Sequence, residues 1–393
     1  MKKSLLNRIL GILLILYCAV IIRDIFVDKE EYQWDLYKYY ACAKAYQAGV
    51  NPYDARAVSQ VVQNKVISLA NPPIILFVAQ FFTEMDFNLI FDFFLTLKCL
   101  LIILLIYFWR NAFLDKQVDI TFYLLCLFGF NSAIYLDLRA GNITIFVQCV
   151  IWLAFFYYTR HKFFRFSILI IAASIFKLQP ILFIFLLLFI ENKSKYQLLF
   201  GSLTVFSVLI FMQYIYDPQL FFRFVAGLIN LSGVEREIVN PSTSAFLRDL
   251  IDIFLRIENQ SLHNIISALL YLVVITPVIF ISGLAYRRIK SIKIKDREKW
   301  IVFFGCFVYA VVANYFKDYS YVLLILPTYF IIKNTRLSPK GLLLFIAVIF
   351  ATGYLPGERP ILDLFWGYHP LFLAYFLWYL YMYEMRRLEI PRD

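Results

Sequence analysis

Long apolar runs separated by short polar stretches fill most of the chain. A helix that crosses the hydrocarbon core of a membrane needs about 20 apolar residues, so each long run is a candidate span. The pattern predicts an all-α polytopic membrane protein with about 12 transmembrane helices, folded as a single domain over residues 1–393. The predicted spans are residues 8–27, 87–109, 119–136, 143–159, 166–176, 180–190, 197–215, 264–285, 300–316, 319–333, 341–354 and 370–385.

The composition supports this class. Hydrophobic residues make up 62% of the chain and charged residues 17%, whereas soluble domains have about 45–50% and about 25%. A chain this apolar cannot cover its core with polar surface, so its solvent must largely be lipid. The six cysteines are scattered and the three histidines are distant from one another, which gives neither a disulfide framework nor metal-ligand spacing.

The net charge of +11 reflects membrane topology rather than nucleic-acid binding. With residue 1 placed in the cytoplasm, more than half of the 38 Lys and Arg residues fall in loops predicted to be cytoplasmic, as the positive-inside rule requires. We therefore expect a multi-pass protein of the inner (plasma) membrane, in contact with membrane lipids and without a nucleic-acid partner. Both termini would lie in the cytoplasm.

Two long segments are predicted to lie outside, at residues 28–72 and 217–263. In the first, residues 35–48 have helical spacing, Gly49 ends that helix and Asp54 caps a second one. The apolar stripe of the second helix is made by Val58, Val61, Val62, Val66 and Leu69. Both helices are expected to be amphipathic and to lie in the membrane interface. The second outer segment has no strong pattern and is expected to be mobile until substrate binds.

Two short apolar stretches suggest irregular backbone at membrane depth. Residues 74–82 are too few to cross and are expected to line a cavity as a re-entrant piece. The runs 166–176 and 180–190 meet at Lys177, either as a hairpin or as one kinked helix. Basic clusters on both sides favour the hairpin.

Polar groups stand at four places where lipid or interface makes them costly. These are Trp34-Asp35, residues 139–142, Lys177 and residues 317–320, and all four fall on the predicted outer side. Their convergence on one face predicts a site. Taken singly, Asp35 is equally well explained as a helix N-cap, and Arg139 as an interfacial cation whose charge reaches water.

The same residues carry a resemblance to a known family. Trp34-Asp35, the stretch 49–54 and Pro72-Pro73 resemble the opening of glycosyltransferase family 87. The likeness continues through residues 139–142 and 175–180 and ends near residues 318–327. This sequence has Asn142 where the family usually has glutamine, and it lacks the histidine expected after Asp318.

The resemblance implies a GT-C-like membrane bundle that transfers a hexose, mannose in the family's known members, from a polyprenyl-phosphate sugar to a lipid-linked or envelope glycan. Asp35 is the expected general base, with Glu31 as second choice. Arg139 and Lys177 are expected to stabilise the departing phosphate. The candidate substrate-binding residues are Trp34, Tyr39, Asn51, Tyr53, Arg139, Asn142, Lys177, Asp318 and Tyr319.

One base and one displacement predict inversion of the anomeric centre. No cofactor and no metal is expected, since cations can hold the phosphate, and a monomer is the default. The residues leave arabinose, galactose and glucose open as the sugar. Three other functions remain: a carrier or flippase of a lipid-linked or anionic substrate, a surface-polysaccharide polymerase or ligase, and a membrane scaffold.

Overall fold

The computed structural model describes residues 2–27, 32–67, 69–191, 193–231, 239–255, 257, 259–291, 296–334, 346–348 and 360–387. All regular secondary structure in these residues is helical, which confirms the all-α class. The bundle contains α1 (Lys2–Val27), α5 (Phe87–Ala112), α6 (Ile120–Ala140), α7 (Thr144–Thr159), α8 (Phe163–Phe176), η3 (Gln179–Phe189), α9 (Lys195–Tyr216), α12 (Gln260–Ser291), α13 (Arg297–Val312), α14 (Val322–Asn334) and α17 (His369–Arg387). The shorter helices are α2 (Trp34–Gln47), α3 (Ala55–Val62), α4 (Ile74–Ala79), η2 (Gln80–Phe82), α10 (Pro218–Leu231), α11 (Thr243–Phe254), η5 (Asp318–Tyr321) and α16 (Pro360–Gly367).

The bundle helices coincide with the apolar runs of the sequence. Among the described residues, α5, α6, α9 and α12 are each long and apolar enough to cross a membrane. The predicted span 341–354 lies outside the described residues apart from 346–348. The number of passes therefore stays a prediction.

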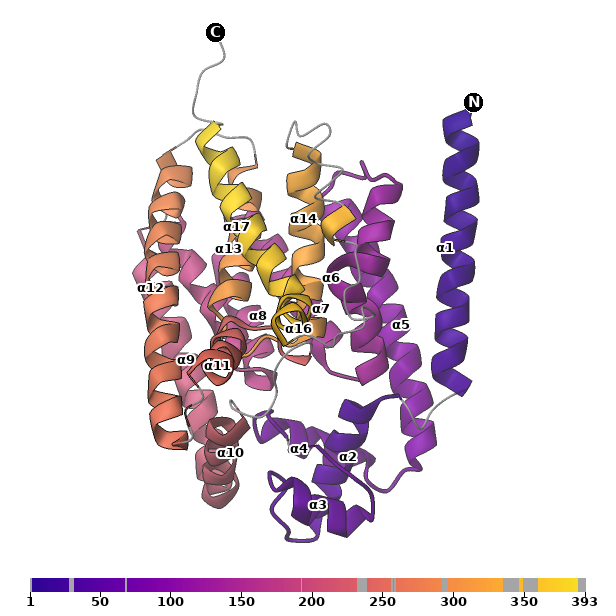
Figure 1. Ribbon diagram of the computed structural model, residues 1–393, viewed down its shortest axis with the longest axis vertical. Helices are drawn as coiled ribbons and strands as arrows, with labels where there is room; N and C mark the ends of the chain where they lie inside the picture. The colour runs from indigo at the N-terminus through magenta and orange to yellow at the C-terminus, as the bar shows by residue number, and fades with distance from the viewer. Residues whose placement is uncertain are drawn as a thin grey trace.

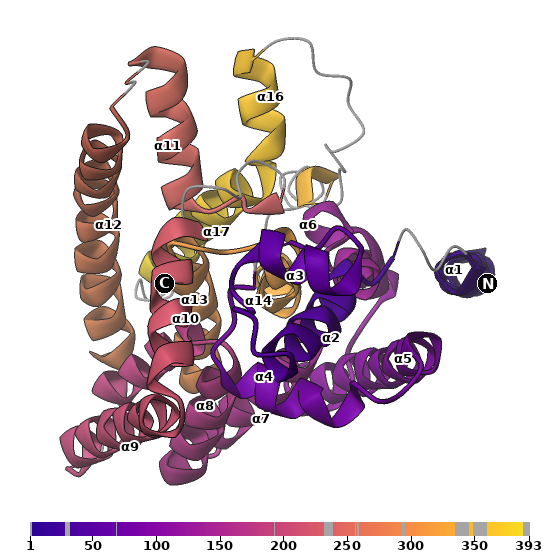
Figure 2. The ribbon, with the colours of Figure 1, turned by 90° about the horizontal axis from the view of Figure 1, so that it is seen from below.

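The apolar interior of the described residues has a large cluster inside the bundle, a smaller one at one end, and a third that joins α11, α16 and α17. In Figure 1, α2, α3, α4 and α10 lie beyond that end, whereas the start of α1 and the end of α17 lie at the opposite end. Figure 2 shows α2 and α4 lying across the ends of the bundle helices. The smaller cluster joins α2, α3, α4 and α10. Ile143 and Phe176 pack against both clusters, so they mark the seam between them.

The segment around Lys177 is a hairpin. The Lys177 ammonium donates to the hydroxyl of Thr144, at the start of α7, at 2.5 Å. At the far end of α7, the Tyr158 hydroxyl donates to the Leu186 carbonyl, near the end of η3, at 3.1 Å. Helix α8 therefore ends beside the start of α7, and η3 leads back toward the far end of α7. This confirms the hairpin and rules out one kinked helix.

Helix α2 is not amphipathic as the sequence suggested, and its place in the membrane interface stays a prediction. It buries charged side chains as well as apolar ones, among them Asp35, Leu36, Lys38 and Tyr39. The expectation was wrong because the two charged groups pair with each other, at 2.5 Å. A paired charge can be buried on the polar side of a helix, which a lone charge cannot.

The second predicted helix of this segment is shorter than expected. Asp54 caps α3 as predicted, accepting from the backbone N–H groups of Arg56 and Ala57. The helix then ends at Val62, because Gln63 adopts a left-handed conformation with φ 53°. Val66 and Leu69 are buried but follow the helix rather than extend it.

The described part of the outer segment 217–263 is also more regular than its pattern suggested. Helix α10 packs Leu220 and Phe224 into the smaller cluster, and Ser242 caps α11. The Asn240 side chain accepts from the N–H of Phe316 at 2.9 Å. Leu220 and Phe224 have the i, i+4 spacing of a helix face, so part of this segment does carry a helical pattern, and its mobility before substrate binds stays a prediction.

A glycine turn at the end of α6 positions α2. Gly141 has φ 68°, and its N–H donates to the Asp137 carbonyl. Just beyond it, Gln33 donates through its backbone N–H to the Arg139 carbonyl at 2.7 Å and through its side chain to the Leu138 carbonyl at 2.5 Å. These bonds fix the chain that enters α2 onto the end of α6.

The substitution Gly141→Ala tests this contact. A Cβ atom would lie 2.4 Å from Gln33 Oε1 and 3.0 Å from Gln33 Cα, at a positive φ that alanine rarely adopts. We expect a loss of stability of more than about 1 kcal/mol, seen as a lower melting temperature in detergent. Gly201→Ala, in α9 with no atom within 4 Å, is the control and should melt no lower than the wild type. Equal melting of the two variants would contradict the contact.

Candidate functional site

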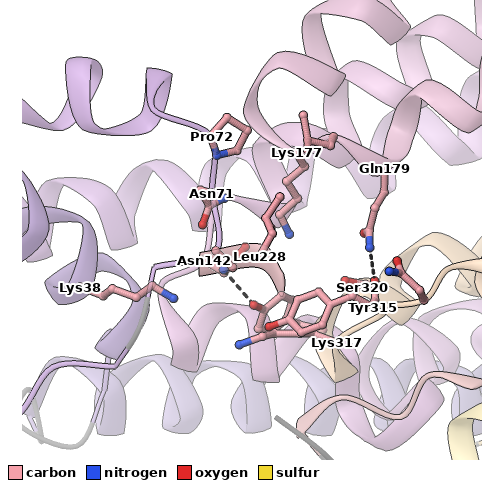
Figure 3. A pocket seen from close by; sticks show the side chains of 14 residues that line it. Lys38, Asn71, Pro72, Asn142, Lys177, Gln179, Leu228, Tyr315, Lys317 and Ser320 are labelled. Atoms are coloured by element: carbon pink, nitrogen blue, oxygen red, sulfur yellow. Dashed lines mark hydrogen bonds between the residues drawn. The ribbon is translucent and has the colours of Figure 1, made fainter. Parts of the chain in front are cut away.

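Four segments that are distant in the sequence meet between the bundle and α2. They are the start of α2, the α6–α7 turn, the α8–η3 turn and residues 314–321 before α14, and residues 70–72 and Leu228 of α10 complete the wall. Their side chains surround a cavity of about 280 Å³ (Figure 3). It is lined by Lys38, Ala70, Asn71, Pro72, Asn142, Lys177, Leu178, Gln179, Leu228, Asn314, Tyr315, Lys317, Tyr319 and Ser320.

Asp35 is a fully buried carboxylate beside this cavity. Its Oδ1 accepts from the Lys38 ammonium at 2.5 Å, and its Oδ2 accepts from the Asn142 amide at 2.6 Å and the Tyr319 hydroxyl at 3.2 Å. Burial alone would raise the pKa of Asp35, but the charges of Lys38 and Lys317, with hydrogen bonds from Lys38 and Asn142, outweigh it. The pKa is held well below its usual range, so Asp35 is ionised at neutral pH.

Asn142 connects three elements. Its amide nitrogen lies 3.0 Å from the Tyr39 hydroxyl and 2.9 Å from the Tyr319 hydroxyl, in addition to Asp35. Its amide oxygen accepts from the N–H of Thr144 at 3.1 Å and from the Thr144 hydroxyl at 2.7 Å. Because the oxygen faces two donors, the nitrogen must face the carboxylate.

Lys177 extends this network across the cavity. Its ammonium donates to Thr144, Thr144 donates to Asn142, and Asn142 donates to Asp35, with successive distances of 2.5, 2.7 and 2.6 Å. The Lys177 Nζ also lies 5.2 Å from the centre of the Tyr319 ring. Burial lowers the pKa of Lys177 to about 7, although the nearby carboxylates oppose this shift.

The cavity is electrically positive. Its lining residues include three lysines, Lys38, Lys177 and Lys317, and no carboxylate. Asp35, immediately behind this lining, pairs with Lys38. Amides and hydroxyls make up most of the remaining polar lining. The site can therefore hold an anion together with neutral groups rich in hydroxyls.

A second buried ion pair, which was not predicted from the sequence, lies under the α6–α7 turn. The Lys98 ammonium contacts Asp137 Oδ2 at 2.7 Å, and both side chains are fully buried. Lys98 also donates to the carbonyls of Asp137 and Asn142, at 2.5 and 2.9 Å. It thereby fixes the backbone of Asn142 from behind. A lone lysine within an apolar run was the available signal.

Several sequence-predicted residues lie near the cavity without lining it. Asp318 accepts from the N–H of Tyr319 at 2.7 Å, and burial raises the pKa of its carboxyl group to about 7. Asn51 accepts from the N–H of Tyr53 within a turn. The Tyr53 hydroxyl donates to the carbonyl of Asn71, a lining residue, at 3.1 Å. Asn51 and Tyr53 therefore support the cavity wall from outside.

Arg139 and Trp34 are not brought to the cavity. The Arg139 guanidinium lies over the rings of Tyr32 and Trp34, at 5.3 and 5.8 Å from their centres. It is not among the lining residues, and Lys38 and Lys317 supply charges that were expected from it. Asp35 is not an N-cap, since Gln33 precedes the first residue of α2. Glu31 lies outside the described residues.

Comparison with known protein families identifies the class of protein to which this chain belongs. The model of glycosyltransferase family 87 matches residues 70–316, more than half of the chain. The chain belongs to glycosyltransferase family 87. Together with its apolar helices, this makes the protein a membrane glycosyltransferase. Searches of curated proteins and of solved structures gave no match.

The family match covers part of the site. It includes Lys98, Asn142 and Lys177, but it begins after Asp35 and ends just before Lys317. Of the cavity's three lysines only Lys177 lies within the matched residues, together with Asn142, whereas Asp35 and Lys38 come from α2 and Lys317 follows the match. No cluster of three or more His, Cys, Asp or Glu able to hold a metal occurs among the described residues.

Anion binding should weaken as the pH rises. An anion favours the protonated form of Lys177, whose pKa is about 7, and the unionised form of Asp318, whose pKa is also about 7. Between pH 6 and 8.5, Lys177 loses its charge and Asp318 gains one, and both changes oppose binding. A soluble dialkyl phosphate keeps its charge in this range, so its dissociation constant, measured calorimetrically, reports the protein alone.

Two variants separate the contributions to this pH dependence. Lys177→Arg stays charged and should flatten part of it, and Asp318→Asn should flatten the remainder. A pH dependence that is unchanged in both variants would show that other groups titrate.

Removal of the Lys98 charge should destabilise the protein strongly. Lys98→Met leaves Asp137 buried without a counter-charge, a change that costs about 3–5 kcal/mol. The double variant Lys98→Met, Asp137→Leu has no unpaired charge and should recover part of this loss. Melting of the three proteins in detergent checks this order, and a single variant as stable as the wild type would contradict it.

Proposed function

We propose that the protein transfers a hexose, with mannose as the family default, from a polyprenyl-phosphate sugar to a hydroxyl of a lipid-linked or envelope glycan. One observation carries the proposal: a cavity lined by three lysines lies at the end of an apolar bundle, and a buried carboxylate stands directly behind it. The donor has an apolar tail, one phosphate and one sugar. The apolar bundle matches the tail, the lysines of the cavity match the phosphate, and the amides of its lining match the hydroxyl groups of the sugar.

The lysines support a role in leaving-group stabilisation. The donor phosphodiester carries one negative charge, and its phosphate gains a second when the sugar leaves. Lys177 and Lys317, with Nζ atoms 5.2 and 5.8 Å from the centre of the same Tyr319 ring, stand on the side of the cavity formed by the η3 and η5 segments. Cations fixed where charge develops stabilise the transition state more than the ground state. We include metal independence in the proposal, because these ammonium groups can supply the required charge.

Asp35 is the proposed general base. Its Oδ2 lies behind Asn142 and Tyr319, both lining residues, so an acceptor hydroxyl can reach it by displacing one of these donors. Its low pKa keeps it ionised, and proton transfer to it late in the reaction typically contributes about 10²–10⁴ in rate. A single displacement with this base inverts the anomeric centre.

We place the reaction at the outer face of the inner (plasma) membrane. Acidic residues are concentrated in the segments predicted to be outside, and the helices α2, α3, α4 and α10 lie at the end of the bundle opposite the start of α1 and the end of α17 (Figure 1). With both termini in the cytoplasm, that end faces outward. The remaining expected partners are membrane lipids and the glycan acceptor, with a monomer as the working unit.

Asp35→Asn tests the base. With a panel of synthetic polyprenyl-phosphate sugars, the purified wild type should turn over at least one donor, and Asp35→Asn should lower turnover by at least about 10²-fold while it still binds the lipid. Asp86→Asn, at the exposed cap of α5, is the matched control and should keep wild-type turnover, since Asn caps a helix as well as Asp does. Turnover retained in Asp35→Asn would remove Asp35 from this role. Lipid binding without turnover by the wild type would favour a flippase.

A further inference from the structure

Lys38 has a position unlike that of an ordinary buried ion-pair lysine. It lies one helical turn after Asp35 on α2, is 3% exposed and contacts Oδ1 of that carboxylate at 2.5 Å. At the same time its side chain lines the cavity and extends toward Asn142 (Figure 3). It therefore stands between the carboxylate and the space where the phosphate is expected.

The Lys98–Asp137 pair shows what a structural pair looks like in this fold. Lys98 uses its donors on a carboxylate and two backbone carbonyls, and it does not line the cavity. The Lys38 ammonium hydrogen-bonds Asp35 alone among the described residues. An ammonium group has three donors, so two of them remain for a ligand in the cavity.

We propose that Lys38 is a catalytic residue that changes partner during turnover, pairing with Asp35 before the transfer and with the leaving phosphate after it. The proposal rests on the function proposed above and deepens it. Lys177 and Lys317 would hold the phosphate throughout the reaction. Lys38 would stabilise the additional negative charge that the phosphate gains when the sugar leaves.

The charge balance of the reaction gives the reason. The acceptor oxygen forms a bond to the anomeric carbon, and the bond from that carbon to the phosphate oxygen breaks with its electron pair going to the phosphate. The acceptor proton goes to Asp35. The phosphate changes from −1 to −2 while the carboxylate changes from −1 to 0, so one unit of negative charge moves across the site.

A cation in contact with both the carboxylate and the phosphate loses its carboxylate partner just as the phosphate becomes more negative. Lys38 loses its attraction to Asp35 when the carboxylate is protonated, and its ammonium is then available to the phosphate. Its stabilisation is therefore largest when charge has developed on the leaving group. An interaction made mainly in the transition state raises kcat, whereas one made equally with the substrate changes KM.

Lys38→Met and Lys38→Arg test the kinetic role in the full-length purified protein. Lys38→Met should lower kcat by about 10²–10³-fold, with a smaller change in the KM of the donor. The acid limb of its pH profile should move to higher pH, because the pKa of Asp35 rises without the adjacent charge. Lys38→Arg keeps the charge and should recover much of the rate. Wild-type kcat in Lys38→Met would overturn the proposal.

Binding of polyprenyl phosphate, the product, tests the exchange without turnover. Asp35→Asn mimics the protonated carboxylate, frees Lys38 and should bind this dianion about tenfold more tightly than the wild type does. The double variant Asp35→Asn, Lys38→Met leaves neither charge unpaired, so it should fold, and it should lose this gain. Comparison of the two single variants with the double variant isolates the interaction between Asp35 and Lys38. A gain in affinity for polyprenyl phosphate that persists in the double variant would overturn the proposed change of partner.

The kinetic and binding experiments also separate this proposal from the one on which it rests. A wild type that turns over no donor in the panel would overturn the proposed function and this inference with it. A wild type that turns over a donor, together with Lys38→Met that loses donor and product affinity equally and keeps its pH profile, would overturn the role of Lys38 alone.

Discussion

The burial of one carboxylate organises this end of the molecule. A carboxylate removed from water is tolerated only when cations and hydrogen-bond donors replace the lost solvent. Asp35 obtains them from its own helix through Lys38, from the α6–α7 turn through Asn142 and from the segment before α14 through Tyr319. Three elements must therefore meet at one point, and the cavity is the space left between them, the α8–η3 turn, residues 70–72 and α10.

The positions of these groups depend in turn on tight backbone contacts. Gly141 lets Gln33 approach the end of α6, which sets the start of α2. Lys98 holds the carbonyl of Asn142, and Thr144 holds the oxygen of its side chain, so the amide has one orientation. The site is thus built by elements on both sides of the seam between the large cluster and the smaller one, and the family match includes residues of both clusters but not α2.

Much of this arrangement could be predicted, because helices exposed to lipid have long apolar runs that are visible in the sequence. Helices such as α5 and α9 stand out as long apolar runs, and the convergence of Asp35, Asn142 and Lys177 followed from the side on which each loop falls. Side-chain direction could not be predicted. Arg139 shares the turn with Asn142 but points to aromatic rings, and the Lys98–Asp137 pair joins two apolar runs whose contact the sequence does not reveal.

The small size of the cavity bears on which lipid donors the enzyme would accept under the proposed function. Its volume of about 280 Å³ falls below the roughly 300–1,000 Å³ of pockets that enclose a drug-sized ligand. A sugar and its phosphate would fill it, and a polyprenyl tail of any length would have to remain in the surrounding bilayer. Under the proposed function, an enzyme of this shape would bind the headgroup of its donor, and donors that differ only in the number of isoprene units would compete on equal terms.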